Sequence, residues 1–340
     1  MKLAQFWTKK DNKIQCQLCN HYCLISEGKV GVCAVRKNIN GELHSLVYGK
    51  LISENDNDPI EKKPLFHFLP GSLTYSIATV GCNLRCMHCQ NADISQYPIE
   101  EQFKENVVPG HNTTPEQVIE RAKASGCQSI AYTYTEPTIF AEFAIDCMKL
   151  ARKAGLRNVW VSNGYTSKEA WPKILPYLDA INVDLKFFKN ETYLKVCGCK
   201  LQPVLDNLKV LKKKKIWLEI TTLVIPGFND SDDELLQIAM FIKNELGKCV
   251  PWHLSRFYPQ YKLQDTDPTE EERIYTAVQL GKEAGLKYVY GGNVLGEKLE
   301  NTYCPNCNEL VIERKGYDIK RFDRDGKCPK CSEKIDLVLK

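Results

Sequence analysis

The sequence predicts an α/β protein built as a full or partial (β/α) barrel of the TIM type, with a four-cysteine module before the barrel and a zinc ribbon after it. Short apolar runs alternate with helical patterns through residues 73–300, as in parallel βα units. Polar motifs follow the predicted strands one after another, which places them together at the carboxyl end of a barrel. Cysteine-rich stretches flank this body on both sides. We therefore divide the chain into residues 1–72, 73–300 and 301–340.

The composition indicates a metal-binding protein of the cytoplasm. The 340 residues include 46 Lys and Arg against 42 Asp and Glu, so the formal net charge is +4. This balance gives no reason to expect nucleic acid or an anionic membrane as a partner. No apolar run is long enough to span a membrane, and the N-terminus lacks the apolar core of a signal peptide. In a cytoplasmic chain, 16 cysteines point to metal binding or catalysis before disulfides.

The strands and helices of the body are predicted from hydrophobic periodicity and from capping residues. Apolar runs predict strands at residues 75–80, 129–134, 158–162, 180–185, 216–224, 252–257 and 287–290. Helical patterns begin at the hydroxyl caps Thr114, Ser231 and Thr269. Residues 54–58 are polar and end at Pro59, which predicts a loop. Residues 60–71 are expected to be an extended segment that packs on the barrel.

The most informative stretch is residues 81–91, which read GCNLRCMHCQN. Cys82, Cys86 and Cys89 follow the spacing C-x3-C-x2-C directly after the first predicted strand. Zinc knuckles usually separate paired cysteines by two residues, so the first gap of three argues against zinc. A 4Fe-4S cluster normally takes four cysteines, and three would leave one iron with an open position. An open coordination position is what a catalytic metal needs.

This loop resembles the signature of the radical S-adenosylmethionine (SAM) enzymes, and its flanks CNLRC and CQN resemble the pyruvate-formate-lyase (glycyl-radical) activating branch. The resemblance implies a TIM-like radical SAM barrel with Cys82, Cys86 and Cys89 as the catalytic cluster ligands. It implies that the open iron binds SAM, whose reductive cleavage gives a 5′-deoxyadenosyl radical. That radical abstracts hydrogen from a substrate, and activating enzymes take this hydrogen from a protein glycine.

The same resemblance implies a set of SAM-binding residues after the strands. Glu136, in Tyr-Thr-Glu-Pro, matches the carboxylate that binds the SAM ammonium, although Tyr134 and Thr135 replace two glycines of the family motif. Ser162 and Asn163 match a polar stretch that meets the ribose hydroxyls. The remaining matches are Asp184 and Lys186 for the methionine end of SAM and residues 225–230 for a loop beside the adenine and sulfonium.

Three residues carry weaker signals. His253, beside the sixth predicted strand, fits either an adenine contact or a packed core histidine, and we keep both readings. Cys197 and Cys199 fit either a substrate-facing thiol pair or inert buried cysteines, so we assign them no role.

The two ends of the chain each carry four cysteines. The first group fits a zinc site or a second iron–sulfur cluster; we favour zinc and leave the cluster open. Its members are Cys16, Cys19, Cys23 and Cys33. The second group has the spacing C-x2-C-x20-C-x2-C and predicts a zinc ribbon. Its members are Cys304, Cys307, Cys328 and Cys331. Asn308 and Ser332 stand where each knuckle usually has a glycine.

The whole chain resembles the radical SAM component of the AmmeMemoRadiSam system. The resemblance covers CQLCNHYCLISEGKVGVCAVR, PIEKKPLFHFLPG, GCNLRCMHCQN, YTEPT, VDLKFF and the ribbon. It implies Memo-type and AMMECR-type partners, and the chemistry requires an electron donor such as flavodoxin or ferredoxin. The expected cofactors are a 4Fe-4S cluster, SAM and zinc. Two alternatives stay open: radical SAM modification of RNA or a small molecule, and a non-catalytic metal-stapled scaffold.

Overall fold

The computed structural model describes residues 1–97, 107–294 and 298–340. Its centre is an eight-stranded sheet in the order β16-β15-β14-β13-β12-β11-β9-β8. Strand β8 pairs antiparallel with β9, and every other neighbouring pair is parallel. The bounds are β8 Ser53–Pro59, β9 Leu73–Ala78, β11 Ser129–Tyr132, β12 Arg157–Ser162, β13 Ala180–Asp184, β14 Trp217–Val224, β15 Trp252–Arg256 and β16 Val289–Gly292. Strands β16 and β8 are the edges, so the sheet is open and does not close into a full barrel.

The prediction of a loop at residues 54–58 is wrong, because these residues form most of β8. Glu54 lies opposite Ile77 and Asn55 opposite Ser76 in the ladder with β9. Polar side chains are tolerated there because β8 is an edge strand. The carboxylate of Glu54 accepts a hydrogen bond of 2.8 Å from Arg121. The seven predicted strands of the body all overlap observed strands.

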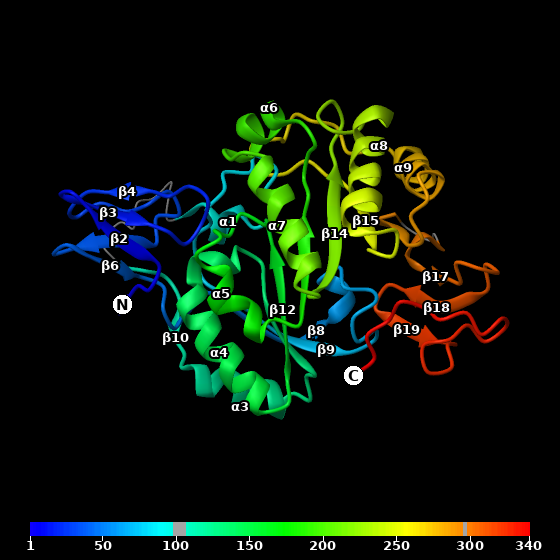
Figure 1. Cartoon of the computed structure of the whole chain (residues 1–340), viewed down its shortest axis with the longest axis horizontal. Coiled ribbons are helices and arrows are strands. Elements are labelled where there is room, and N and C mark those ends of the chain that lie inside the picture. The colour runs from blue at the N-terminus through cyan, green and yellow to red at the C-terminus, as the bar shows by residue number, and fades with distance from the viewer. Residues whose placement is uncertain (98–106, 295–297) are drawn as a thin grey trace.

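Helices connect the parallel strands. The longer ones are α3 Pro115–Ala124, α4 Ala141–Lys153, α7 Gln202–Lys213, α8 Asp232–Phe241 and α9 Glu271–Glu283, and the short ones are α1 Ala92–Ser95, α5 Trp171–Ile174 and α6 Asn190–Thr192. Single turns of 3-10 or π type are η1 Ile60–Lys62, η3 Pro137–Phe140, η4 Leu175–Tyr177, η5 Tyr193–Cys197, η6 Ile242–Leu246 and η7 Lys298–Glu300. In Figure 1, α4, α7 and α8 lie in front of the central strands.

Two of the three predicted helix caps are confirmed, and the third is wrong. Thr114 forms a full capping box with Gln117 at the start of α3, and the Ser231 hydroxyl accepts from the backbone N–H of Glu234 at the start of α8. The cap at Thr269 is wrong, because α9 begins at Glu271 after Glu270. The Thr269 hydroxyl instead donates to the carbonyl oxygen of Val224 at 2.6 Å. A tertiary hydrogen bond to the end of β14 therefore took the place of a local cap.

The N-terminal part of the chain forms small antiparallel sheets, which we call the cysteine-rich hairpins (residues 2–45). They contain β1 Lys2–Leu3, β2 Trp7–Lys10, β3 Lys13–Cys16, β4 Leu24–Ile25, β5 Arg36–Ile39 and β6 Glu42–Ser45. The sheet orders are β1-β6-β5 and β2-β3-β4, and a further pair joins β7 Lys50–Leu51 to β10 His111–Asn112. The hairpins lie at the left end of Figure 1, in blue.

The C-terminal ribbon (residues 301–340) lies at the opposite end, in orange and red in Figure 1. Its sheet contains β17 Thr302–Tyr303, β18 Leu310–Lys315 and β19 Asp318–Arg321, and the last two strands lie between the two cysteine knuckles. The ribbon shares a small apolar core with the central body through Phe66, Tyr288 and Tyr290. The ribbon is therefore docked on the body.

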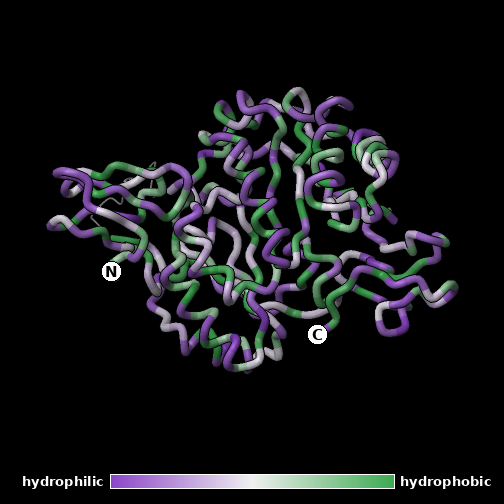
Figure 2. Tube along the Cα trace, viewed as in Figure 1, coloured by the Kyte–Doolittle hydropathy of each residue, from purple (hydrophilic) through white to green (hydrophobic). Residues whose placement is uncertain are grey.

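The segment before β9 covers part of the central sheet. Ile60, Leu65 and Phe68 pack against Ala131 and Val159, which belong to β11 and β12. The expected packing is confirmed, but the segment is not extended, because η1 and further turns occupy most of residues 60–71. Figure 2 shows hydrophilic residues along the outer turns of the hairpins and the ribbon. Among the helices of the described residues, none combines the length and hydrophobicity needed to cross a bilayer.

Candidate active site

The three cysteines of residues 81–91, the cluster loop, lie where β9 ends. Cys82 and Cys86 are buried and Cys89 is half-buried. The loop turns sharply at Gly81, whose φ of +98° is a conformation that residues with a Cβ rarely adopt. A Cβ at Gly81 would also lie 2.8 Å from the Val35 side chain. Cys82, Cys86 and Cys89 all line one cavity of about 560 Å³.

The surroundings of Cys86 favour its thiolate form. The hydrogen bond with Cys197 lowers the pKa of the Cys86 thiol, and the Lys186 charge adds to this against the opposing effect of burial. The backbone N–H of Arg85 also donates to the carbonyl oxygen of Cys197 at 2.8 Å. Cys197 thus supports the cluster loop through a contact between distant segments, which could not be predicted from the sequence. A thiolate is the form that binds metal.

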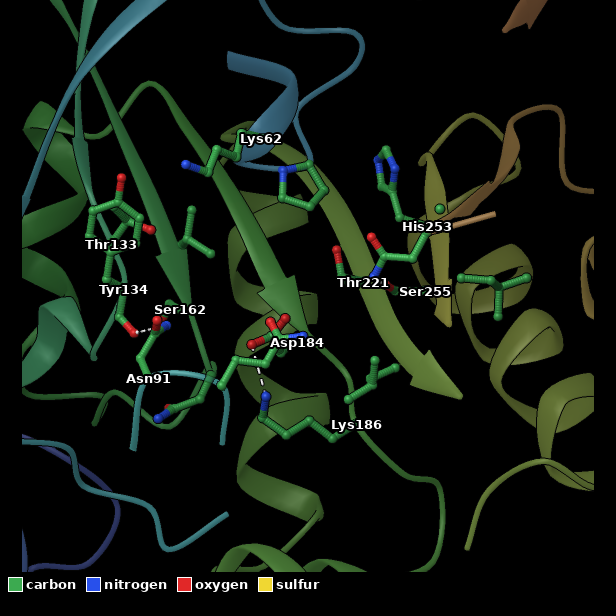
Figure 3. Close-up of a pocket in the computed structure, with 18 of the residues that line it drawn as sticks. Lys62, Asn91, Thr133, Tyr134, Ser162, Asp184, Lys186, Thr221, His253 and Ser255 are labelled. Atoms are coloured by element: carbon green, nitrogen blue, oxygen red, sulfur yellow. Dashed lines mark hydrogen bonds and ion pairs between the residues drawn. The ribbon is translucent and has the colours of Figure 1, made fainter. Parts of the chain in front are cut away.

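Asp184 and Lys186 form the charged floor of the same cavity, as Figure 3 shows. The Lys186 Nζ and the Asp184 Oδ2 are 2.9 Å apart. Burial lowers the pKa of Lys186, but the Asp184 and Cys86 charges outweigh burial and raise this pKa. The Asn229 side chain donates to the carbonyl oxygen of Lys186 at 2.7 Å, so the loop at residues 225–230 holds the Lys186 backbone. The Asp184–Lys186 pair therefore lies beside the cluster loop, and Lys186 keeps its positive charge.

Glu136 lies near this cavity but is not among the residues that line it. The carboxylate is fully buried and accepts from the Ser162 hydroxyl at 2.9 Å and from the Asn163 backbone N–H at 2.8 Å. The Thr138 hydroxyl also donates to it, at 2.5 Å. Burial raises the pKa of Glu136, and these hydrogen bonds oppose the rise. Glu136 therefore orients the end of β12, and its oxygens are already occupied by partners within the protein.

Tyr134 stands where the family motif has a glycine, and its backbone takes a conformation that glycine favours. Its φ is +65°, the left-handed region that glycine adopts most easily. The Tyr134 hydroxyl bonds to Asp58 and lies 3.3 Å from the Lys63 Nζ. Asn91 of the cluster loop donates to the Tyr134 carbonyl oxygen at 2.8 Å. These side-chain contacts hold the strained backbone beside the cavity.

Ser162 and Asn163 both line the cavity, and Asn163 connects β12 to the cluster loop. The Asn163 side chain donates to Asn83 Oδ1 at 2.8 Å and lies 3.8 Å from the Cys82 sulfur. The Asn83 carbonyl oxygen contacts His21 Nε2 at 2.7 Å. Asn163 therefore holds the loop in place through Asn83.

His253 lies at the side of the cavity away from Ser162 in Figure 3. It is buried and lines the cavity, and its Nε2 is 2.7 Å from Glu219. The imidazole stacks on Tyr290 with ring centroids 5.2 Å apart. Burial raises the pKa of Glu219, but the hydrogen bond and charge of His253 outweigh burial and lower it. His253 is thus a packed histidine that also borders the cavity.

His88, which sequence reasoning missed, lies between the ligands Cys86 and Cys89. Both ring nitrogens are buried and have no hydrogen-bond partner within the described residues. The side chain lines the cavity. Burial and the Lys186 charge lower the pKa of His88 to about 3, so the imidazole is neutral at pH 7. The signal that could have identified His88 is its position in the sequence between the predicted ligands Cys86 and Cys89.

The ribbon cysteines form a separate and tight metal-ligand group. Their four sulfur atoms all lie within 4.8 Å of one another. Two pairs, Cys304 with Cys331 and Cys307 with Cys328, are each 3.6 Å apart. Asn308 and Ser332 have φ of +58° and +62°, so both knuckles take the left-handed turn that usually carries glycine. This geometry suits a metal such as zinc.

Comparisons with known proteins identify relatives of this chain. Residues 76–239 match the Radical SAM superfamily. The uncharacterized protein MJ0808 of Methanocaldococcus jannaschii is 48% identical over 343 residues, which cover 100% of both chains. The chain therefore contains a Radical SAM domain and belongs to the same family as MJ0808.

Its radical SAM domain is distantly similar to pyruvate formate-lyase activating enzymes. The pyruvate formate-lyase 1-activating enzyme of Escherichia coli (strain K12) is 23% identical over 228 residues, which cover 62% of this chain and 89% of that enzyme. A solved structure of TYW1 with a lysine-pyruvate adduct bound covers 82% of this chain and 85% of its own, with 16% identity and a TM-score of 0.47.

The residues at the cavity fit the cofactors that this superfamily implies, a 4Fe-4S cluster and SAM. Three cysteines of one loop are the donor set of a cluster with one open iron. The unpartnered nitrogens of His88 and the Asp184–Lys186 pair face the same cavity and can receive a polar, charged ligand.

Proposed function

We propose that this protein cleaves SAM reductively at the cluster loop and uses the resulting radical to abstract hydrogen from a protein substrate. One observation carries the proposal. Three cysteines from one loop and an adjacent aspartate–lysine pair line a single cavity. A scaffold would have no use for charges that converge at this place, because holding them there without a ligand costs free energy.

Each residue group has a stated role in this proposal. Cys82, Cys86 and Cys89 hold the 4Fe-4S cluster, which supplies the electron that breaks one carbon–sulfur bond of SAM. Asp184 and Lys186 bind the methionine end of SAM, where Lys186 offers a cation to the carboxylate and Asp184 accepts a hydrogen bond from the amino group. This uses the two unlike charges 2.9 Å apart.

The strand ends after β11 and β12 support binding at a distance from the reacting bond. Ser162 and Asn163 line the cavity and can reach the ribose, although the Ser162 hydroxyl already donates to Glu136. We therefore assign Glu136 a positioning role in place of the direct ammonium contact expected from the sequence. His253 borders the cavity as a wall next to Tyr290.

A protein glycine is the hydrogen source we propose, because the similarity to an enzyme that activates pyruvate formate-lyase covers 62% of this chain. The cavity wall extends to Lys62 and to Tyr317 of the ribbon, so a polypeptide segment can approach between the body and the ribbon. We further propose an external one-electron donor such as flavodoxin or ferredoxin, Memo-type and AMMECR-type partners, and a cytoplasmic location. The sequence motifs support the partners and the location.

The direct test is product formation by the anaerobically reconstituted, reduced protein. We expect conversion of SAM to 5′-deoxyadenosine and methionine, measured by liquid chromatography. Cys86→Ala should lose this activity because it removes a cluster ligand. The matched control is Cys249→Ala, which alters a half-buried cysteine outside the three groups and should keep the activity. A Cys86→Ala protein that still cleaves SAM would contradict the proposal.

A second test concerns the Asp184–Lys186 pair that lines the cavity. Lys186→Met should weaken SAM binding by about 30-fold or more, because it leaves the SAM carboxylate without its buried cation. The control is Lys62→Met, which changes an exposed lysine at the rim and should alter binding little. Isothermal titration of SAM into each reconstituted protein measures the difference. Equal affinities for wild type and Lys186→Met would remove Lys186 from the site.

A further inference from the structure

The N-terminal cysteines differ in spacing from those of the ribbon. Charge interactions link Cys19 to Cys16, Cys23 and Cys33, so the four thiols surround one region. A zinc ion with Zn–S bonds of about 2.3 Å holds its four sulfurs about 3.8 Å apart. Among the residues that the structure describes, the ribbon cysteines alone form a group of three or more ligand atoms within 4.8 Å. The N-terminal sulfurs are therefore spread more widely than one zinc ion would hold them.

The wider spacing is the one expected for an iron–sulfur cube, because each thiolate binds a different corner iron. The three sulfurs of the cluster loop likewise do not all lie within 4.8 Å of one another. The two sites differ in their ligand count. The cluster loop supplies three thiolates, whereas the hairpins supply four from Cys16, Cys19, Cys23 and Cys33. Four ligands leave no iron open, so such a cluster could exchange electrons but could not bind SAM.

The four hairpin cysteines lie directly behind the cluster loop. Arg85, from that loop, bonds through its guanidinium to the carbonyl oxygens of Val32 and Cys82. The same guanidinium interacts through its charge with the thiols of Cys82, Cys33 and Cys23. A Cβ at Gly81, the residue before Cys82, would lie 3.0 Å from the Cys33 carbonyl oxygen. One guanidinium and a few peptide groups therefore separate the two sets of cysteines.

The hairpin site also has an outer edge. Cys19 and Cys23 are half-buried, whereas Cys82 and Cys86 are buried. Exposed apolar side chains stand beside the hairpin cysteines in the chain, namely Leu24, Val30 and Val32. A protein donor could therefore approach the hairpin cysteines from outside, while the cluster loop lies deeper.

We propose that Cys16, Cys19, Cys23 and Cys33 bind a second 4Fe-4S cluster that relays electrons from an external flavodoxin- or ferredoxin-type carrier to the cluster loop. The relay rests on the proposed function, because SAM cleavage consumes its electron. For each SAM cleaved, the carrier is oxidised by one electron, the carbon–sulfur bond breaks and methionine leaves. This reverses the preference for zinc that the sequence alone supported.

Metal analysis of the full-length chain tests the site without reference to activity. After anaerobic reconstitution we expect about eight irons and about one zinc per chain, because each cube holds about four irons. The double variant Cys19→Ser/Cys23→Ser should keep about four irons, and so should Cys82→Ser. Mössbauer spectra should show that the irons lost from the two variants differ. About four irons and two zincs in wild type would overturn the proposal.

Electron delivery tests the relay. The double variant should bind SAM with wild-type affinity and still form 5′-deoxyadenosine when dithionite is the reductant. With reduced flavodoxin it should lose most of this activity, because the inner cluster is no longer reached from the outer edge. Equal rates of wild type and variant with flavodoxin would overturn the relay. If wild type cleaves no SAM with either reductant, the proposed function fails, while the iron count still decides whether the second cluster exists.

Discussion

The two ends of this chain carry the same number of cysteines and use them differently. In the ribbon, four sulfurs gather within 4.8 Å, and matched left-handed turns at Asn308 and Ser332 close the two knuckles. In the cysteine-rich hairpins, which the structure describes in full, no three of the four sulfurs lie within 4.8 Å of one another, and Arg85 connects this site to the cluster loop. The comparison teaches that spacing and neighbours decide which metal a cysteine group suits, and that the number of cysteines alone does not.

The two ends are also attached to the body in different ways. The ribbon packs aromatic residues of the body into its own core, and Arg314 lies 4.2 Å over the Phe66 ring. The hairpins are attached to α4 by a buried ion pair in which Arg36 binds Glu142 at 2.9 and 3.0 Å. Apolar packing contributes to both attachments, because Phe6, Val35 and Leu43 of the hairpins belong to the main core, and the hairpins add this buried ion pair.

The largest expected effect comes from loss of the ribbon metal. Cys304→Ser should remove about one zinc per chain and unfold the ribbon, because structural zinc sites supply about 10 kcal/mol or more of folding free energy. Hydrogen exchange of residues 301–340 and zinc analysis measure the result, and the iron content should stay unchanged. Retention of zinc with a protected ribbon would show that the four cysteines are not a metal site.

The next effect concerns the attachment of the hairpins. Glu142→Gln should lower the free energy of unfolding by about 3–5 kcal/mol, because it leaves the buried Arg36 charge without its partner. The matched control is Lys2→Ala, which removes a half-exposed pair between the same regions, Lys2 and Asp146, and should cost about 1 kcal/mol or less. Urea denaturation under anaerobic conditions compares the two. A similar cost for both variants would contradict the assigned attachment.

The same ion pair should make the hairpins sensitive to acid. Burial raises the pKa of Glu142, but the Arg36 charge and hydrogen bonds outweigh burial and hold this pKa below its ordinary value of 4.5. The pair therefore contributes its full stability above pH 4.5 and loses it as the pH falls through the lower, folded pKa. Hydrogen exchange in the hairpins should rise in this acid range in wild type, and this step should be absent in Glu142→Gln.

A smaller effect is expected at the attachment of the ribbon. Arg314→Lys should cost about 2 kcal/mol, because lysine cannot replace the planar set of buried donors. Arg314 donates to the carbonyl oxygens of Phe66 and Glu300 and to the Thr302 hydroxyl. Thermal unfolding of the ribbon, followed through zinc release, measures the loss. No change in the release temperature would mean that the apolar core alone seats the ribbon.

The smallest expected effect is a gain in the stability of the second knuckle of the ribbon. Ser332→Gly should stabilise the second knuckle by about 1 kcal/mol or less, because glycine relieves the left-handed backbone at φ of +62°. Asn308→Gly should gain less, because asparagine tolerates this conformation better. Zinc dissociation rates compare the two variants, and a faster rate in Ser332→Gly would contradict the strain argument.

The sequence predicted what local spacing encodes. Short apolar runs predicted the seven strands of the body, and cysteine spacing predicted the ribbon. Contacts between distant segments could not be predicted from the sequence. Residues 54–58 became an edge strand because β9 supplies a partner, and Thr269 bonds to Val224 in place of capping α9. Likewise, Ser162 and Asn163 donate hydrogen bonds to the Glu136 carboxylate, and these contacts could not be predicted from the sequence.

The site was predictable only in part for the same reason. The ligands of the cluster loop and the Asp184–Lys186 pair are short motifs, and all five line the cavity. Cys197 reaches Cys86 only because η5 folds against the cluster loop. His88 was visible in the motif but carried no spacing rule that would have singled it out.

The central claim is that the cluster loop holds a 4Fe-4S cluster whose open iron binds SAM. Electron–nuclear double resonance on the reduced protein with SAM labelled by nitrogen-15 at its amino group tests this most directly. The account predicts a coupling between the cluster spin and the labelled nitrogen, and no such coupling in Cys86→Ala. A reduced wild-type cluster that binds labelled SAM by calorimetry yet shows no nitrogen coupling would contradict it.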